Sequence, residues 1–125
     1  MNVVDSSGWL EYFNDRDNAD FFVPAIEAVD ELIIPSISLF EVFKRILIER
    51  NRDDALEAIA LMKAGEVVDL DDNLALVAAE LSFESKLPMA DSIILATARA
   101  YTATLWTQDA HFKDIDGVRY IEKTG

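Results

Sequence analysis

The apolar segment from Pro88 to Arg99 constrains the fold more than any other stretch of this chain. Apolar residues recur on nearly every side of the helix that it predicts, which is typical of a helix buried in the middle of a domain. Pro88 precedes the first turn, where a proline often begins a helix, and Asp91 is the one carboxylate of the segment. Free backbone N–H groups and the helix dipole favour an acid there. Asp91 is therefore either a helix-starting acid or one member of a larger site.

Short apolar runs alternate with helical patterns along the rest of the chain. We expect strands at residues 2–4, 32–35, 66–70, 104–107 and 118–121, and further helices at 9–13, 19–29, 39–48, 53–64 and 74–86. This alternation predicts an α/β fold with a mostly parallel central sheet of about five strands and helices on both faces. Residues 1–125 contain no repeat or linker and are predicted to form a single domain. The aromatic residues expected in its core, or in part on a dimer face, are Trp9, Phe13, Phe40, Phe43 and Trp106.

Composition limits the location of the protein and the chemistry of any site. No segment reaches the roughly 18 apolar residues of a membrane span and no signal-peptide pattern opens the chain, so we expect a cytoplasmic protein without a membrane partner. With no cysteine and one histidine, His111, any metal is expected to have oxygen ligands. His111 itself is interpreted as a surface or turn residue, because no partner is spaced for it. The net charge of −13 opposes nucleic-acid binding unless a metal ion or a local basic face overrides it.

Three more acids stand at junctions comparable to that of Asp91. Asp5 follows the first predicted strand and Asp109 follows the fourth, at the sheet edge where open α/β proteins bind ligands. Glu41 lies near the start of a predicted helix. Local explanations exist for two of them, because Asp5 suits an N-cap and Ser38 with Glu41 fits a capping box.

The joint arrangement of the four acids favours a metal site. Carboxylates brought within a few ångströms repel one another, which raises their pKa values or requires a compensating cation. With oxygen ligands, that cation is expected to be Mg²⁺ or Mn²⁺, which leaves coordination positions for water and phosphate. A site of this kind suits hydrolysis of a phosphodiester bond.

The sequence resembles PIN-domain ribonucleases, and within them the VapC-type toxins of toxin–antitoxin pairs. The segments that carry the resemblance are Val3-Val4-Asp5-Ser6-Ser7, Ser38-Leu39-Phe40-Glu41-Val42, Ala90-Asp91-Ser92-Ile93-Ile94-Leu95-Ala96-Thr97-Ala98 and Leu105-Trp106-Thr107-Gln108-Asp109-Ala110-His111-Phe112. The resemblance implies a PIN-like domain and a Mg²⁺-dependent endoribonuclease. It also implies a tRNA or rRNA substrate and a homodimer that a small antitoxin inhibits. The catalytic and metal-binding residues that it implies are Asp5, Glu41, Asp91 and Asp109, with Ser6 and Thr107 as supporting polar groups.

The cations nearest to these acids in the sequence are the candidates for phosphate contacts, namely Lys44, Arg45, Lys86 and Arg99. Two other functions remain open from the sequence. Asp5 and Asp69 each follow a predicted strand, as in a phospho-accepting receiver-type signalling domain that also uses Mg²⁺. The same fold without the chemistry would be a catalytically inactive protein-binding module.

Overall fold

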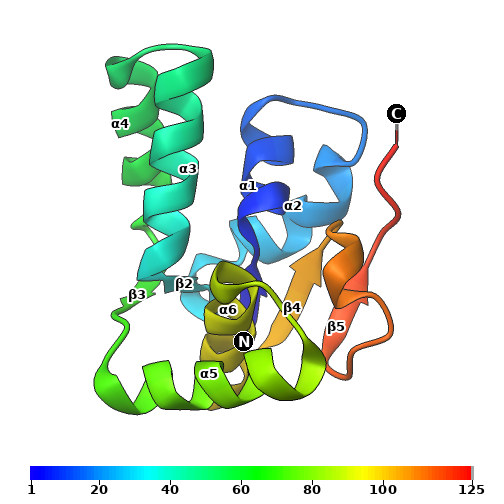
Figure 1. The fold of residues 1–125 in the computed structure, drawn as a ribbon. Coiled ribbons are helices and arrows are strands. Elements are labelled where there is room, and N and C mark those ends of the chain that lie inside the picture. The colour runs from blue at the N-terminus through cyan, green and yellow to red at the C-terminus, as the bar shows by residue number, and fades with distance from the viewer. Residues whose placement is uncertain (125) are drawn as a thin grey trace.

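The structure is a computed structural model that describes residues 1–124. Strands and helices alternate along the chain, as the sequence predicts (Figure 1). The strands are β1 Asn2–Val4, β2 Ile33–Pro35, β3 Glu66–Val68, β4 Thr104–Thr107 and β5 Val118–Tyr120. The helices are α1 Ser6–Phe13, α2 Ala19–Glu27, α3 Ser36–Glu49, α4 Arg52–Met62, α5 Asp72–Ser85 and α6 Met89–Ala100, with short 3₁₀ helices η1 Val29–Glu31 and η2 Ala110–Phe112.

All the strand pairings among residues 1–124 are parallel, which confirms the predicted sheet. Strand β4 lies between β1 and β5, and β2 pairs with β3. A single bridge between Asn2 and Leu32 joins the two groups, so the order across the molecule is β3, β2, β1, β4, β5. The chain leaves β1 on one side and returns to its other side with β4. The carboxyl ends of β1 and β4 therefore form the topological switch point, where open α/β sheets bind ligands.

The two faces of the sheet carry separate halves of the core, because successive strand residues point in opposite directions. Val4 and Trp106 pack in a cluster with buried residues of α1, α2, α3 and α4. Their neighbours Val3 and Leu105 pack in a second cluster with α5 and α6. Helices thus cover both faces, as predicted, and α3 and α4 extend together away from the sheet (Figure 1).

Helix α6 is the buried central helix that the apolar segment predicts. All seven residues from Ser92 to Ala98 are buried, and the helix contacts α5 as well as β1, β2 and β4. Full burial of a side chain such as Ile94 or Leu95 stabilises the fold by about 1.5–3 kcal/mol. The helix begins at Met89, directly after Pro88, and this start places Asp91 in its first turn.

Helix α3 begins at Ser36, earlier than predicted, because it follows β2 without a loop. Ser38 therefore lies inside the first turn, where its side chain is fully buried and its hydroxyl has no hydrogen-bond partner within residues 1–124. The predicted capping box between Ser38 and Glu41 is wrong. The residue at the N-cap is Pro35, whose side chain has no oxygen to accept a backbone hydrogen bond.

Most of the predicted aromatic core is confirmed, since Trp9 and Trp106 are buried and Phe13 and Phe43 pack against the same cluster. Phe40 is the exception, because it lies on the outer side of α3 and is 63% exposed. The predicted helix at 19–29 is also shorter, ending at Glu27 before η1. None of the helices between residues 1 and 124 is both long enough and apolar enough to cross a bilayer.

Candidate active site

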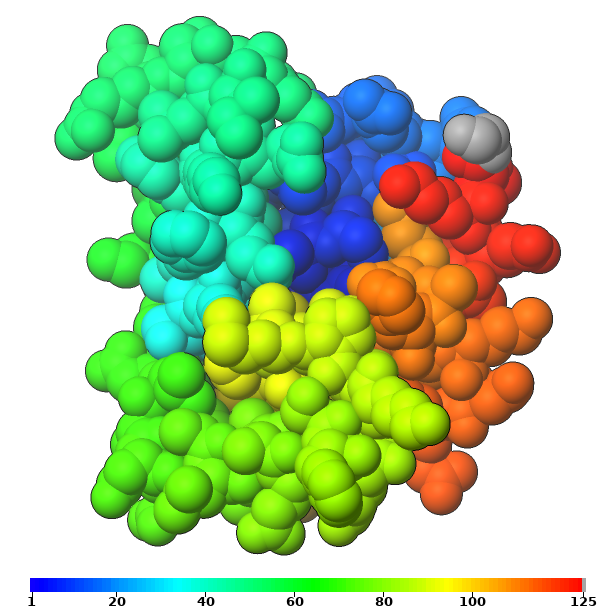
Figure 2. Space-filling view, in the orientation of Figure 1, coloured from blue at the N-terminus to red at the C-terminus, as the bar shows by residue number. Residues whose placement is uncertain are grey.

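The four predicted acids gather around the switch point of the sheet. Asp5 follows β1 directly and Asp109 follows β4, whereas Asp91 and Glu41 project from α6 and α3. Figure 2 shows the start of α1 (dark blue) recessed between α3 (cyan), α6 (yellow) and the segment that follows β4 (orange). The charge of Asp109 contributes to raising the pKa of both Asp5 and Asp91, and the charge of Glu41 contributes to raising the pKa of Asp91. All four acids therefore share one electrostatic environment.

Asp5 is the buried member of the group, with 3% of its surface exposed. It is the N-cap of α1, because its Oδ1 accepts a hydrogen bond of 2.9 Å from the backbone N–H of Gly8. The hydroxyl of Thr107 donates to Oδ2 at 2.6 Å, and the hydroxyl of Ser7 donates to the same carboxylate at 2.8 Å. Burial raises the pKa of Asp5 to about 7, although these hydrogen bonds oppose the rise. The N-cap interpretation is confirmed, and the capping carboxylate also lies among the other acids.

Two hydroxyl groups fix the positions of the acids. Thr107 donates to Asp5 and at the same time accepts the backbone N–H of Asp109 at 2.9 Å, so it fixes the chain where β4 ends. Ser6 donates to Oε1 of Glu41 at 2.6 Å and ties the start of α1 to α3. The two side chains predicted to support the site therefore contact the predicted acids directly.

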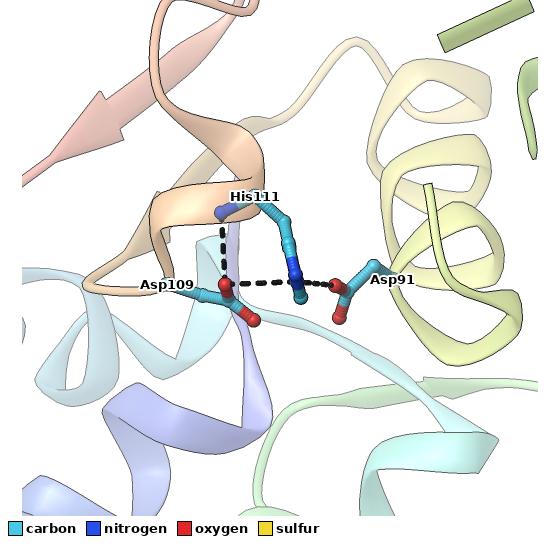
Figure 3. A group of neighbouring side chains, drawn as sticks. All are labelled: Asp91, Asp109 and His111. Carbon is cyan, nitrogen blue, oxygen red and sulfur yellow. Dashed lines mark hydrogen bonds and ion pairs between the residues drawn. The ribbon is translucent and has the colours of Figure 1, made fainter. Parts of the chain in front are cut away.

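Asp91, Asp109 and His111 form the tightest cluster at this edge (Figure 3). Nδ1 of His111 lies 2.9 Å from Oδ2 of Asp91 and 3.1 Å from Oδ1 of Asp109. The backbone N–H of His111 also donates to Oδ1 of Asp109 at 2.9 Å, which makes Asp109 the cap of η2. One possible ligand atom from each of the three residues lies within 4.8 Å of the others.

The hydrogen bond of Asp91 goes to His111 and not to the backbone of α6. The helix dipole still stabilises the negative charge of Asp91 in the first turn. A capping hydrogen bond, however, does not explain why an acid stands at this position. Partial burial, together with the charge of Asp109, raises the pKa of Asp91 to about 6, and the contact with His111 opposes that rise.

The expectation that His111 has no partner is wrong, although its side chain is 59% exposed as a surface residue should be. The hydrogen bond that His111 donates to Asp91 is the largest cause of a raised pKa for His111, followed by the charge of Asp109. Its spacing of two residues from Asp109 was a signal in the sequence, because a turn brings such residues together. The contact with Asp91, 20 residues away, depends on the packing of η2 against α6 and has no local signal.

The two carboxylates of this cluster fit a hard divalent cation. Mg²⁺ in proteins is usually held by one or two carboxylates and keeps several water ligands, and Asp91 and Asp109 offer two neighbouring carboxylates. These two residues would hold the ion. Among the described residues, Asp5 and Glu41 lie outside the group within 4.8 Å, so they are less directly placed than predicted. The expectation of oxygen ligands alone overlooks the imidazole nitrogen of His111 inside the cluster.

Two of the four predicted phosphate contacts border the acids. Lys44 and Arg45 line a cavity of about 250 Å³ together with Ser6 and Glu41. Lys44 also lies over the ring of Phe40, with Nζ 5.8 Å from the ring centroid. Both cations are therefore beside the carboxylates on the α3 side of the recess.

The other two predicted contacts lie elsewhere. Arg99 is eight residues after Asp91 on α6, which puts their backbones about 12 Å apart along the helix. It lines a different cavity, of about 580 Å³, with Asp69 and Tyr101. Lys86 ends α5 in a left-handed conformation and is not among the residues that line the cavities next to the acids. Nearness in sequence to Asp91 is misleading here, because a helix carries its later residues away from its first turn.

Two cations that the sequence does not single out also lie near the site. Arg16 and Lys123 line a cavity of about 340 Å³ together with Arg45, Ser7 and Gln108. Arg16 comes from the loop between α1 and α2, and Lys123 from the segment after β5. Neither has a local pattern that marks it, because only the folded chain brings these segments together.

Comparison with known proteins gives the family of this fold. The family profile of the PIN domain matches residues 3–118. A toxin–antitoxin complex from Klebsiella pneumoniae is a similar solved structure, with 24% identity, a TM-score of 0.80 and coverage of 95% of this chain and 96% of that one. The structure of Mycobacterium tuberculosis VapC20, named as a sarcin–ricin loop cleaving toxin, has 17% identity, a TM-score of 0.75 and coverage of 93% and 95%. DNA-bound VapBC from Salmonella typhimurium has 19% identity, a TM-score of 0.71 and 98% coverage of both chains.

Identities at this level establish a shared fold. The comparison with curated protein sequences gave no significant match. The receiver-type alternative depends on Asp5 and Asp69 lying together. These two residues follow β1 and β3, which are separated by β2, and Asp69 lines the same cavity as Arg99, away from the four predicted acids. The family profile spans nearly the whole chain, and the parallel sheet with helices on both faces agrees with it, so the chain belongs to the PIN-domain family.

Proposed function

We propose that residues 1–125 work as one PIN domain that is a Mg²⁺- or Mn²⁺-dependent endoribonuclease, with Asp5, Glu41, Asp91 and Asp109 as its acidic site. The observation that carries the proposal is the pair of carboxylates Asp91 and Asp109 beside buried Asp5 at the switch point. The pKa values of Asp5 and Asp91 are raised there. Such a cluster gains stability from a divalent cation, which removes the repulsion between the carboxylates.

Hydrolysis of a phosphodiester is the reaction that these residues suit. When bound, Mg²⁺ or Mn²⁺ supplies positive charge that stabilises the charge on the phosphate and favours ionisation of the attacking water. Asp91 and Asp109 would hold the ion, while Asp5 and Thr107 together fix the backbone of Asp109. Ser6 orients Glu41, and we assign to Glu41 the hydrogen bond from the attacking water. The water oxygen bonds to phosphorus and gives up one proton to the solvent as the bond to the ribose oxygen breaks, and the ribose oxygen takes up one proton from the solvent.

RNA contacts are proposed for the cations that border the recess. Lys44 and Arg45 lie on the side of Glu41, and Arg16 and Lys123 share a cavity with Arg45. The same cavities are also lined by Glu11, Glu41 and Glu49, so the four cations supply individual contacts and not a uniformly basic surface. They would contact phosphates on either side of the cleaved bond, since phosphate contacts position a strand without reading its sequence.

We further propose that the protein is a cytoplasmic toxin of a type II pair, a homodimer inhibited by a small antitoxin. The support is the shared fold with the Klebsiella pneumoniae complex and with VapBC from Salmonella typhimurium. Exposed apolar side chains on α3 support binding of a protein partner. Phe40 and Ile48 are 63% and 66% exposed, and both line one cavity with Glu41 and Lys44. A partner segment that combines apolar residues with a basic side chain would suit this surface and the acidic site.

Cleavage of defined RNAs tests the enzymatic proposal. Labelled tRNA and an rRNA sarcin–ricin hairpin are incubated with the protein in Mg²⁺, Mn²⁺ or excess EDTA. Cleavage should require the metal and should be lost in Asp91→Asn. Asp72→Asn is the matched control, because Asp72 occupies the first turn of α5 as Asp91 occupies that of α6, but is exposed. Undiminished cleavage in EDTA, or equal activity of the two variants, contradicts the proposal.

A catalytically inactive protein-binding module is the remaining alternative. It predicts no binding of divalent metal and no difference between Asp91→Asn and Asp72→Asn in any metal-dependent property. Calorimetric titration of the wild type and both variants with Mg²⁺ separates this alternative from an enzyme. Growth of a bacterial host that expresses the wild type or Asp5→Ala then tests the toxin assignment.

A further inference from the structure

We infer that His111 is a ligand of the metal through Nδ1, so that this centre binds Mn²⁺ and later transition ions with a nitrogen donor beside two carboxylates. The inference rests on the proposed metal site and adds to it a residue outside the four acids. It changes the expected metal preference, because an imidazole ligand suits Fe²⁺, Ni²⁺, Cu²⁺ and Zn²⁺, whereas carboxylate and water ligands suit Mg²⁺ and Mn²⁺.

The position of Nδ1 carries this inference. It lies between the two carboxylates, 2.9 Å from Oδ2 of Asp91 and 3.1 Å from Oδ1 of Asp109 (Figure 3). Ligands at about 2.1 Å from one ion and at right angles to each other are about 3 Å apart. The distances from Nδ1 to both oxygens therefore lie in the range of neighbouring ligands around one octahedral ion, a range that also includes the hydrogen bond between His111 and Asp91.

The backbone holds the imidazole ring at that place. Asp109 caps η2 by accepting the N–H of His111, so the carboxylate and the ring are fixed to the same short turn. Thr107 in turn accepts the N–H of Asp109 and anchors the turn to the end of β4. The ring thus has a defined position relative to Asp109 although its outer side is exposed.

An ion between Asp91 and Asp109 has to replace the contacts that Nδ1 makes with them or use Nδ1 as a ligand. Ligation requires that the imidazole be neutral with its proton on Nε2 and that its Nδ1 lone pair be directed at the ion. Displacement would break the contacts to both carboxylates and turn the side chain into solvent. The observed geometry therefore favours ligation, with any proton on Nδ1 released to solvent as the metal binds.

The single histidine of the chain makes the inference directly testable. The protein is prepared without a histidine tag and loaded with Mn²⁺, and nitrogen coupling to the ion is measured by electron spin echo envelope modulation. An imidazole signal from the Mn²⁺-bound protein can then come only from His111. It should change when the protein carries ¹⁵N-histidine and should be absent in His111→Ala.

Metal affinities provide a second measurement. In calorimetric titrations, His111→Ala should weaken binding of Co²⁺ and Ni²⁺ by about tenfold or more and binding of Mg²⁺ by less than about threefold. Lys113→Ala is the control, because Lys113 ends η2 and is exposed but is not part of the cluster. Thermal melts in EDTA confirm that both variants are folded, and His111→Asn serves as a second variant if His111→Ala is not.

The outcomes separate this inference from the proposed ribonuclease. Mn²⁺ binding without an imidazole signal, or equal affinities in the wild type and His111→Ala, overturns the role of His111 and leaves the ribonuclease proposal in place. An imidazole signal without any RNA cleavage supports the role of His111 and contradicts the ribonuclease proposal. Absence of any Mn²⁺ binding to the folded wild type overturns both.

Discussion

In the metal-free protein, stability should fall as the pH rises from about 4 to about 7, and Asp5 should be the main cause. The pKa of Asp5 is raised from 3.8 to about 7 in the folded chain, chiefly by burial. Between these values the folded protein keeps a proton on Asp5 that the unfolded chain has lost. Raising the pH therefore favours the unfolded state, with a slope of about 1.4 kcal/mol per pH unit.

The magnitude follows from the size of the shift. A difference of 3.2 pH units at 1.36 kcal/mol per unit corresponds to about 4 kcal/mol. The contribution is fully present below pH 3.8 and is lost as the pH rises through about 7. Asp91 acts in the same direction up to about pH 6, and His111 extends the decline above pH 6.5 because its folded pKa is also raised. A loss of 4 kcal/mol is large against a typical stability of about 5–15 kcal/mol.

Urea unfolding in EDTA at half-unit steps from pH 5 to pH 8 measures this dependence, with tryptophan fluorescence as the signal. The comparison is Asp5→Asn, which removes the titrating group but loses the hydrogen bond that Thr107 donates. The variant should be less stable than the wild type at pH 5 and should lose most of the slope. Saturating Mg²⁺ should flatten the wild-type curve, because the cation replaces the protons. Two results would show that Asp5 is ionised when buried. One is a metal-free wild type whose stability is constant or rises from pH 5 to 7, and the other is a variant whose stability has the wild-type slope.

Three further changes test other contacts of the site. Thr107→Val removes the donor to Asp5 and leaves the N–H of Asp109 unpaired, so it should cost about 1–3 kcal/mol in urea unfolding and should abolish cleavage of labelled RNA. Gly8→Ala places a Cβ 2.6 Å from the Phe22 ring, and it should lower stability by about 1–3 kcal/mol in the same assay. A double change of Lys44 and Arg45 to Glu should weaken RNA binding by Asp91→Asn protein in fluorescence anisotropy, whereas Arg99→Glu should not; equal losses would place the RNA on a different surface.

The parts of the fold that were predicted correctly depend on repeating patterns. The order of apolar residues in the sequence predicts the run of buried residues in α6. It also predicts that Val3 and Val4 point to opposite faces of the sheet. The placement of Asp5 and Asp109 at one edge followed from each acid ending a parallel strand. The rest depends on packing between distant segments. The contact of His111 with Asp91 and the approach of Arg16 to Lys123 have no counterpart in local sequence.

The local explanations of the four acids indicate which of them serve the structure. Asp5 and Asp109 do cap α1 and η2, so both would be favoured at their positions without any chemistry. Glu41 makes no capping box, and the hydrogen bond of Asp91 goes to a side chain on η2. These two acids receive their hydrogen bonds from other elements, from Ser6 and His111. Capping therefore does not account for Glu41 and Asp91, and their presence beside the other two acids is the stronger indication of a functional site.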